Sequence, residues 1–137
     1  MASHVADVDD NLRAWAKGLA PLEAATEMLI RGGFASPGEP WIRTDEDSAA
    51  RLWIDFGAIA DNKGHLPVGE QKFVTVAASL AANSGHRKVE LGKAIHGLDR
   101  RLTALVLAAV SHANGSQHDR DPLTGRFLGP LVPWPRR

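Results

Sequence analysis

Hydrophobic side chains recur at helical spacing along most of the chain, and the longest such stretch covers residues 89–113. Its apolar positions follow one another at steps of four and three residues, which places them on one face of an α-helix: Leu91, Ile95, Leu98, Leu102, Leu105 and Ala109. Near its C-terminal end the segment LVLAAV is apolar on nearly every side. A helix of that kind must be covered all round. The pattern predicts a central helix on which the rest of the chain packs.

Helical spacing also covers residues 7–31. Pro21 is tolerated there if it lies in the first turn of a second helix, so the pattern predicts two short helices or one kinked helix. Gly32 and Gly33 are suited to end it, because glycine adopts the left-handed conformation that caps a helix. In the loop that follows, the prolines exclude regular structure, and we expect Trp41 to fold back onto the core.

Two more helices are predicted in the middle of the chain. TDEDSAARLWIDFGAIA, residues 44–60, begins with Thr44 as a cap and Asp47 in the capping-box position, and apolar residues then recur at helical spacing. A turn-rich break follows. A fourth helix fits residues 70–82 and would end at Gly85, although its KFVTV segment is equally compatible with a short strand.

The character of the sequence changes after Asn114. The last 23 residues, 115–137, contain four prolines and three glycines and no helical period, so they should be extended. Their apolar residues are too numerous for a disordered tail. We therefore predict an all-α fold: one helical domain over residues 1–114, a bundle of four to five helices around the C-terminal helix. An extended Pro/Gly-rich segment, residues 115–137, would pack on this domain or on a neighbouring subunit.

Composition and charge narrow the function classes. There is no cysteine, which excludes disulfides and thiolate metal sites. No secretion signal or membrane-length apolar run is present, so we expect a cytoplasmic protein without a membrane partner. The 21 alanines, and 11 arginines against 5 lysines, suggest a bacterial or phage origin. Residues 1–60 carry a net charge of −5 and residues 61–137 a net charge of +5. An acidic face that meets a basic face would give this split, but solvated helix faces often differ in sign in the same way, and we favour that interpretation.

Candidate chemistry is sparse. The best metal-ligand group, His112, His118, Asp119 and Asp121, combines imidazole with carboxylate, but its spacing matches no known site and we predict no metal. The sequence contains no G-x-S-x-G or H-E-x-x-H motif and no complete phosphate-binding loop. We therefore predict neither a cofactor nor an enzymatic activity.

The most specific motif lies in residues 77–95, which resemble the turn of a helix-turn-helix DNA-binding unit. Ala81 stands four residues before Gly85, and basic residues follow, although His86 occupies the position where an apolar residue usually anchors the turn. The resemblance implies phosphate or base contacts by the nearby basic side chains: Arg87, Lys88, Lys93, Arg100 and Arg101. Two helices joined by a glycine-capped turn would give the same pattern.

The favoured interpretation is a non-enzymatic interaction protein that binds a second copy of itself or another protein. Leu105, Leu107 and Val110 lie in the segment that is apolar all round, and they are the predicted self-association residues. Pro130 and Pro133 form a P-x-x-P motif, which is also compatible with a docking tail. A DNA-binding regulator is the alternative.

Overall fold

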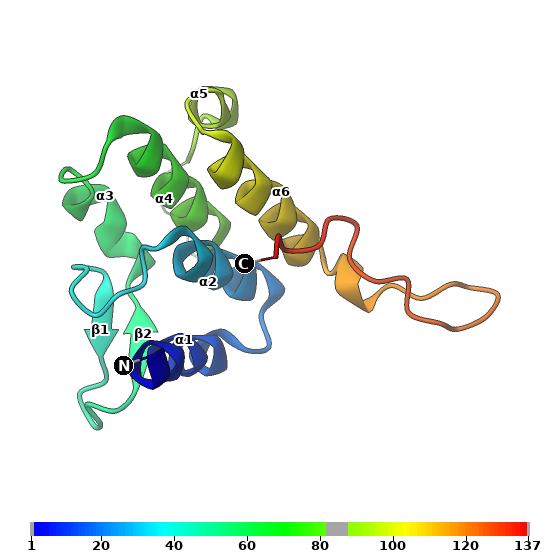
Figure 1. Ribbon diagram of the computed structural model, residues 1–137, viewed down its shortest axis with the longest axis horizontal. Coiled ribbons are helices and arrows are strands. Elements are labelled where there is room, and N and C mark those ends of the chain that lie inside the picture. The colour runs from blue at the N-terminus through cyan, green and yellow to red at the C-terminus, as the bar shows by residue number, and fades with distance from the viewer. Residues whose placement is uncertain (1, 82–87, 137) are drawn as a thin grey trace.

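A computed structural model describes residues 2–81 and 88–136. The described part of the chain is mostly helical, with one small antiparallel sheet (Figure 1). In order, its elements are α1 (Ala2–Ala16), α2 (Ala20–Gly32), β1 (Ile42–Thr44), β2 (Leu52–Ile54), the 3-10 helix η1 (Phe56–Ala58), α3 (Ile59–Asn62), α4 (Val68–Ala81), α5 (Leu91–His96), α6 (Arg100–Asn114) and the 3-10 helix η2 (Ser116–His118).

The N-terminal pattern resolves into two helices. Pro21 lies in the first turn of α2, where its missing N–H is not needed, and Gly33 follows α2 with φ of +92°. The backbone N–H of Gly33 reaches the carbonyls of Leu29 and Ile30, so the glycine caps the helix as the sequence predicted. The fourth predicted helix is confirmed up to Ala81, and the KFVTV segment lies within α4. Its predicted end at Gly85 lies outside the described residues.

The α-helix predicted over residues 44–60 is wrong except at its end, where α3 begins at Ile59, and the fold is therefore not purely α. Residues 42–44 and 52–54 instead form a hairpin, in which Ile42 pairs with Ile54. The Asp45 carboxylate accepts a hydrogen bond from the backbone N–H of Asp47, at 2.9 Å, and so stabilises a turn. Asp and Ser bond to nearby backbone in turns as readily as at helix caps, which explains the error.

The predicted central helix is divided, and it is not the centre of the fold. α5 ends at His96 and α6 begins at Arg100, because the Asp99 carboxylate accepts a hydrogen bond from Leu102 N at 2.7 Å and starts a new helix. Leu91, placed on the buried stripe by its spacing, is 57% exposed. With six α-helices in the described residues, the number exceeds the predicted four to five.

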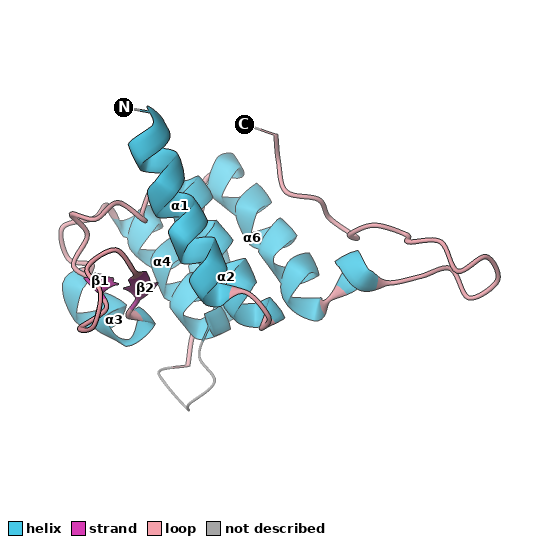
Figure 2. Cartoon of the chain, turned by 90° about the horizontal axis from the view of Figure 1, so that it is seen from below, coloured by secondary structure: helices cyan, strands magenta, loops and turns pink. Residues whose placement is uncertain are grey.

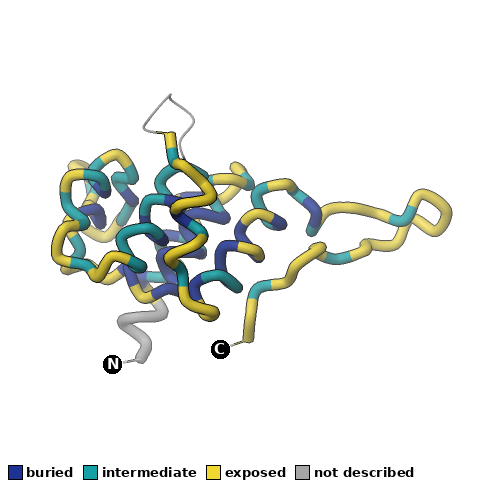
Figure 3. Tube along the Cα trace, turned by 90° about the horizontal axis from the view of Figure 1, so that it is seen from above, coloured by how far each residue is buried: buried dark blue, intermediate teal, exposed yellow. Residues whose placement is uncertain are grey.

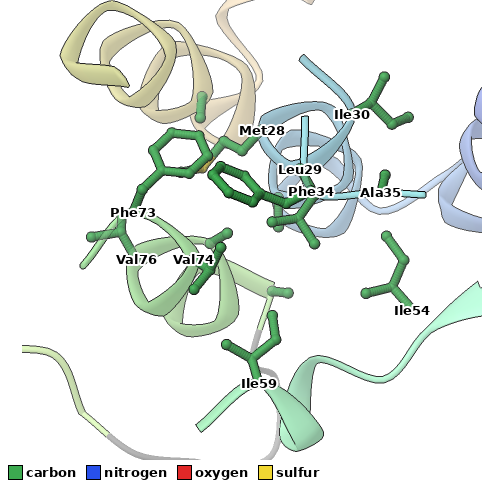
Figure 4. Packing of buried hydrophobic residues seen from close by; sticks show 14 of the residues in the cluster. Met28, Leu29, Ile30, Phe34, Ala35, Ile54, Ile59, Phe73, Val74 and Val76 are labelled. Carbon is green, nitrogen blue, oxygen red and sulfur yellow. The ribbon is translucent and has the colours of Figure 1, made fainter. Parts of the chain in front are cut away.

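The core is built around α2. This helix makes its most extensive contacts with α6 and α4 and also packs on α1. Phe34, which follows α2, lies against Phe73 of α4 with the ring centroids 5.7 Å apart (Figure 4). Trp41 is fully buried, as predicted, and its indole N–H donates to the carbonyl of Phe34 at 2.8 Å. The buried residues of α2 include Ala24, Ala25 and Gly32, whose small size allows neighbouring helices to approach closely.

Candidate functional site

The C-terminal segment leaves the helical body after Gly115 and forms a protruding loop (Figures 1 and 3). We call residues 119–128 the arm. Two backbone hydrogen bonds close it, from Asp121 N to Arg126 O at 2.8 Å and from Leu128 N to Asp119 O at 2.9 Å. The Asp121 carboxylate accepts the N–H of Leu123 at 2.8 Å and so orders the turn at the tip. The arm is therefore a defined hairpin-like structure.

Apolar side chains are exposed mainly in this part of the protein. Of the eleven large hydrophobic residues that are exposed in the described chain, seven lie between positions 107 and 132, and we call them the C-terminal apolar surface: Leu107, Val110, Leu123, Phe127, Leu128, Leu131 and Val132. Leu123 is 94% exposed. Apolar exposure concentrated in one region is typical of an interaction site, whereas single exposed apolar residues are ordinary.

Beyond the arm the chain returns to the helical body, where two buried serines hold it. The Ser111 hydroxyl accepts the N–H of Val132 at 2.9 Å, and the Ser116 hydroxyl accepts the N–H of Leu131 at 3.2 Å. The two hydroxyls are themselves 2.8 Å apart, and Ser116 donates to the carbonyl of Ser111. Buried hydroxyls need such partners, so this network fixes where the segment crosses the end of α6.

The next contacts of the returning chain are with a cluster of charged and aromatic side chains. Trp134 Nε1 donates to His112 Nδ1 at 3.4 Å, and His112 Nε2 lies 3.0 Å from Glu23 Oε1. The guanidinium of Arg31 lies 5.2 Å from the centre of the Trp134 ring and donates to the carbonyl of Pro135. These contacts attach the C-terminal segment to both α2 and α6.

Two carboxylates in this cluster stay ionised by different means. A hydrogen bond from the backbone N–H of Gly18 lowers the pKa of Glu23. Partial burial acts in the opposite direction, but a hydrogen bond with His112 adds to the lowering, and the pKa of Glu23 is lowered overall. Burial alone would raise the pKa of Glu27, but hydrogen bonds from Arg13 and Arg31 prevail and lower it. Glu27 therefore joins α1 to α2 through an ion pair that persists at neutral pH.

A cavity of about 430 Å³ adjoins this cluster and is lined by both basic and acidic side chains. Thr26 Oγ1 is buried beside it and has no hydrogen-bond partner among the described residues. Both ring nitrogens of His112 are occupied: for Nδ1 to accept from Trp134, the proton must be on Nε2, which faces Glu23. His112 thus links α2 to the C-terminal segment through both ring nitrogens. A general base needs one ring nitrogen free to accept a proton from a substrate, and in this arrangement His112 has none.

The predicted self-association residues separate into two groups. Leu105 lies in the core and is 5% exposed. Leu107 and Val110 are 54% and 55% exposed, and they lie three residues apart on the outer face of α6. The segment that is apolar all round is thus covered by the body on one side only.

The predicted DNA contacts remain a prediction. The turn of the helix-turn-helix resemblance and Arg87 lie outside the described residues. Lys88, Arg100 and Arg101 are exposed, and Lys93 pairs with Glu90 at 2.8 Å. The helix that would enter the major groove, α5, has six residues.

The four residues considered as metal ligands do not form one group. His112 faces Glu23 and Trp134, while the Asp121 carboxylate accepts from the turn of the arm. Among residues 2–81 and 88–136, no three His, Asp or Glu side chains are placed to hold a metal ion. None of the described helices has the length and apolar character needed to cross a membrane.

Comparison with known proteins adds no relative: no protein-family model, curated protein or solved structure significantly matches this chain.

Local sequence patterns pointed to α6 and to the C-terminal segment, but not to the arm as a discrete unit. Asp121, Pro122 and Gly125 are the local signals of its turn.

Proposed function

We propose that this protein is a non-enzymatic interaction protein that associates with further copies of itself through the C-terminal apolar surface. The observation that carries the proposal is the concentration of exposed apolar side chains on α6 and the C-terminal segment. Water exposure of these groups is unfavourable by roughly 25 cal/mol per Å², so a partner that covers them gains free energy.

The order of the C-terminal segment supports the same proposal. The serine network and the Trp134 cluster fix the returning chain, and the arm has its own hydrogen bonds. A segment already held in one conformation loses less entropy on binding than a disordered one. Apolar residues on such a segment are thus well suited to a specific contact.

Sedimentation velocity over a wide concentration range tests the proposal. We expect the wild-type mass to rise with concentration. Leu107→Glu/Leu123→Glu, which puts a charge into both the α6 part and the arm part of the C-terminal apolar surface, should shift the association to at least tenfold higher concentration. Val68→Glu/Leu91→Glu is the matched control, because Val68 and Leu91 are exposed to a similar degree on α4 and α5. A wild-type monomer at every concentration would contradict the proposal.

A further inference from the structure

A second surface of the molecule has the properties that the arm would require of a binding site. A groove of about 1020 Å³ lies between α1 and the β1–β2 hairpin. Trp15 and Ala14 of α1 line it together with Leu52 and Trp53 of β2. Trp15 is 37% exposed. Partly exposed indoles in a groove are typical anchors for a protein partner, because they bury a large area with few rotatable bonds.

The groove is also acidic. Its lining includes four carboxylates and two guanidinium groups, which gives a net charge of −2 (−4 and +2). One of the guanidiniums, that of Arg43, is paired with Asp55 at 3.3 Å. Three carboxylates, those of Asp45, Glu46 and Asp47, then face the groove with Arg51 as the remaining positive charge. A partner with apolar side chains flanked by arginines would complement both properties.

The arm carries that combination. Leu123 and Phe127 are exposed, and the guanidinium of Arg120 lies 3.7 Å from the centre of the Phe127 ring. Arg126 is exposed next to Phe127. The arm also contains two aspartates, but the carboxylate of Asp121 accepts backbone N–H groups of the arm's own turn. Asp119, the other one, is at the base. The arm is neutral overall, but both of its arginines lie next to Phe127: Arg126 precedes it in the sequence, and Arg120, which also donates to the carbonyl of Gly125, lies over its ring.

The arm and the β1–β2 hairpin, which lines the groove, lie at opposite ends of the molecule (Figures 1 and 2). The arm projects away from the helical body, whereas the groove is beside the hairpin, so the two surfaces of one copy do not meet. We infer that the arm of one copy binds in the groove of a second copy. This inference rests on the proposed self-association and specifies its contact. Each copy supplies one arm and one groove, so association leads to a reciprocal dimer, a closed ring or, where the rotation does not close, an open filament.

Mixing two complementary variants tests the inference. In the arm variant, Leu123→Ser/Phe127→Ser removes apolar contacts from exposed positions but leaves the groove intact. In the groove variant, Glu46→Lys/Asp47→Lys reverses two exposed charges but leaves the arm intact. We expect each variant alone to associate at least tenfold more weakly than wild type. An equimolar mixture should form a 1:1 heterodimer, since it retains one intact arm and one intact groove, and nothing larger.

Arg100→Glu/Arg101→Glu, a double charge reversal at exposed positions of α6, serves as the control and should associate like wild type. Circular dichroism of each variant establishes that it is folded. If wild type associates, and the arm variant and the groove variant each associate as strongly as wild type, the inference is wrong while the proposed function stands. If the folded variants are monomers but the mixture forms no heterodimer, arm and groove do not bind each other. A wild-type monomer would instead remove the proposed function itself.

Discussion

The side chain of Asn11 joins α1 to the β1–β2 hairpin: its Oδ1 accepts the backbone N–H of Leu52 at 2.9 Å, and its Nδ2 donates to the carbonyl of Ala50. One amide thereby satisfies two backbone groups of a segment 39 to 41 residues away. We expect Asn11→Ala to lower the free energy of unfolding by about 1–2 kcal/mol, since the Leu52 N–H loses its acceptor. Asn11→Asp keeps the acceptor for Leu52 but places a carboxylate oxygen against the carbonyl of Ala50, so it should not recover the lost stability. Urea denaturation measures both variants, and wild-type stability in either one would contradict this role.

Gly32 is required by the packing of α2 against α4. A Cβ placed there would lie 2.7 Å from Cε2 of Phe73, well inside van der Waals contact. Because the Phe73 ring is fully buried, we expect Gly32→Ala to destabilise the protein by about 1–3 kcal/mol. Gly92 of α5, with no atom within 4 Å of its Cβ position, is the control. Gly92→Ala should leave stability unchanged or raise it by up to about 1 kcal/mol. Thermal melts of the two variants in parallel test this contrast.

The start of α6 depends on the Asp99 carboxylate. Asp99→Ala should lower the free energy of unfolding by about 0.5–2 kcal/mol, because the N–H of Leu102 loses its cap. Asparagine also caps helices well, so Asp99→Asn should recover most of that loss. Amide hydrogen exchange at the first turn of α6 provides a local measurement. Unchanged protection of Leu102 in Asp99→Ala would show that the cap is unimportant.

Glu27 makes stability depend on pH. Its pKa in the folded protein lies below the unfolded value of about 4.3, so its stabilising effect is complete above the unfolded pKa and is lost as pH falls through the folded pKa. At pH 7 we expect Glu27→Gln to be destabilised by about 1–2 kcal/mol, because it loses charge-assisted hydrogen bonds to partly exposed arginines. The gap to wild type should narrow below about pH 4. Denaturation at a series of pH values measures it, and a constant gap would refute this explanation.

The sequence alone predicts the helices whose signals are local. Pro21 and Gly33 mark the ends of α2, and the apolar spacing of α4 is regular. The hairpin is missed because strands of three residues are too short to show alternation, and because Thr44 and Asp47 imitate a capping box. The break in the longest helical pattern had a signal in Asp99, three residues before Leu102.

The candidate surfaces depend on contacts between residues far apart in the chain, and no local pattern shows them. His112 and Glu23 are 89 residues apart, and Arg31 and Pro135 are 104 apart. Apolar spacing identifies the C-terminal half of α6, but it cannot distinguish the buried Leu105 from the exposed Leu107, because both lie in a stretch that is apolar all round. The groove likewise exists only once the hairpin lies beside α1.

The arm is closed at its base by its own backbone hydrogen bonds, and its side chains add little to the buried core. Substitutions at Leu123 or Phe127 can therefore accumulate without loss of the fold, whereas residues such as Phe73 are constrained by packing. Related proteins could diverge in partner preference through the arm while keeping the same helical body. The arm is also the place where a foreign recognition sequence could be inserted into this scaffold.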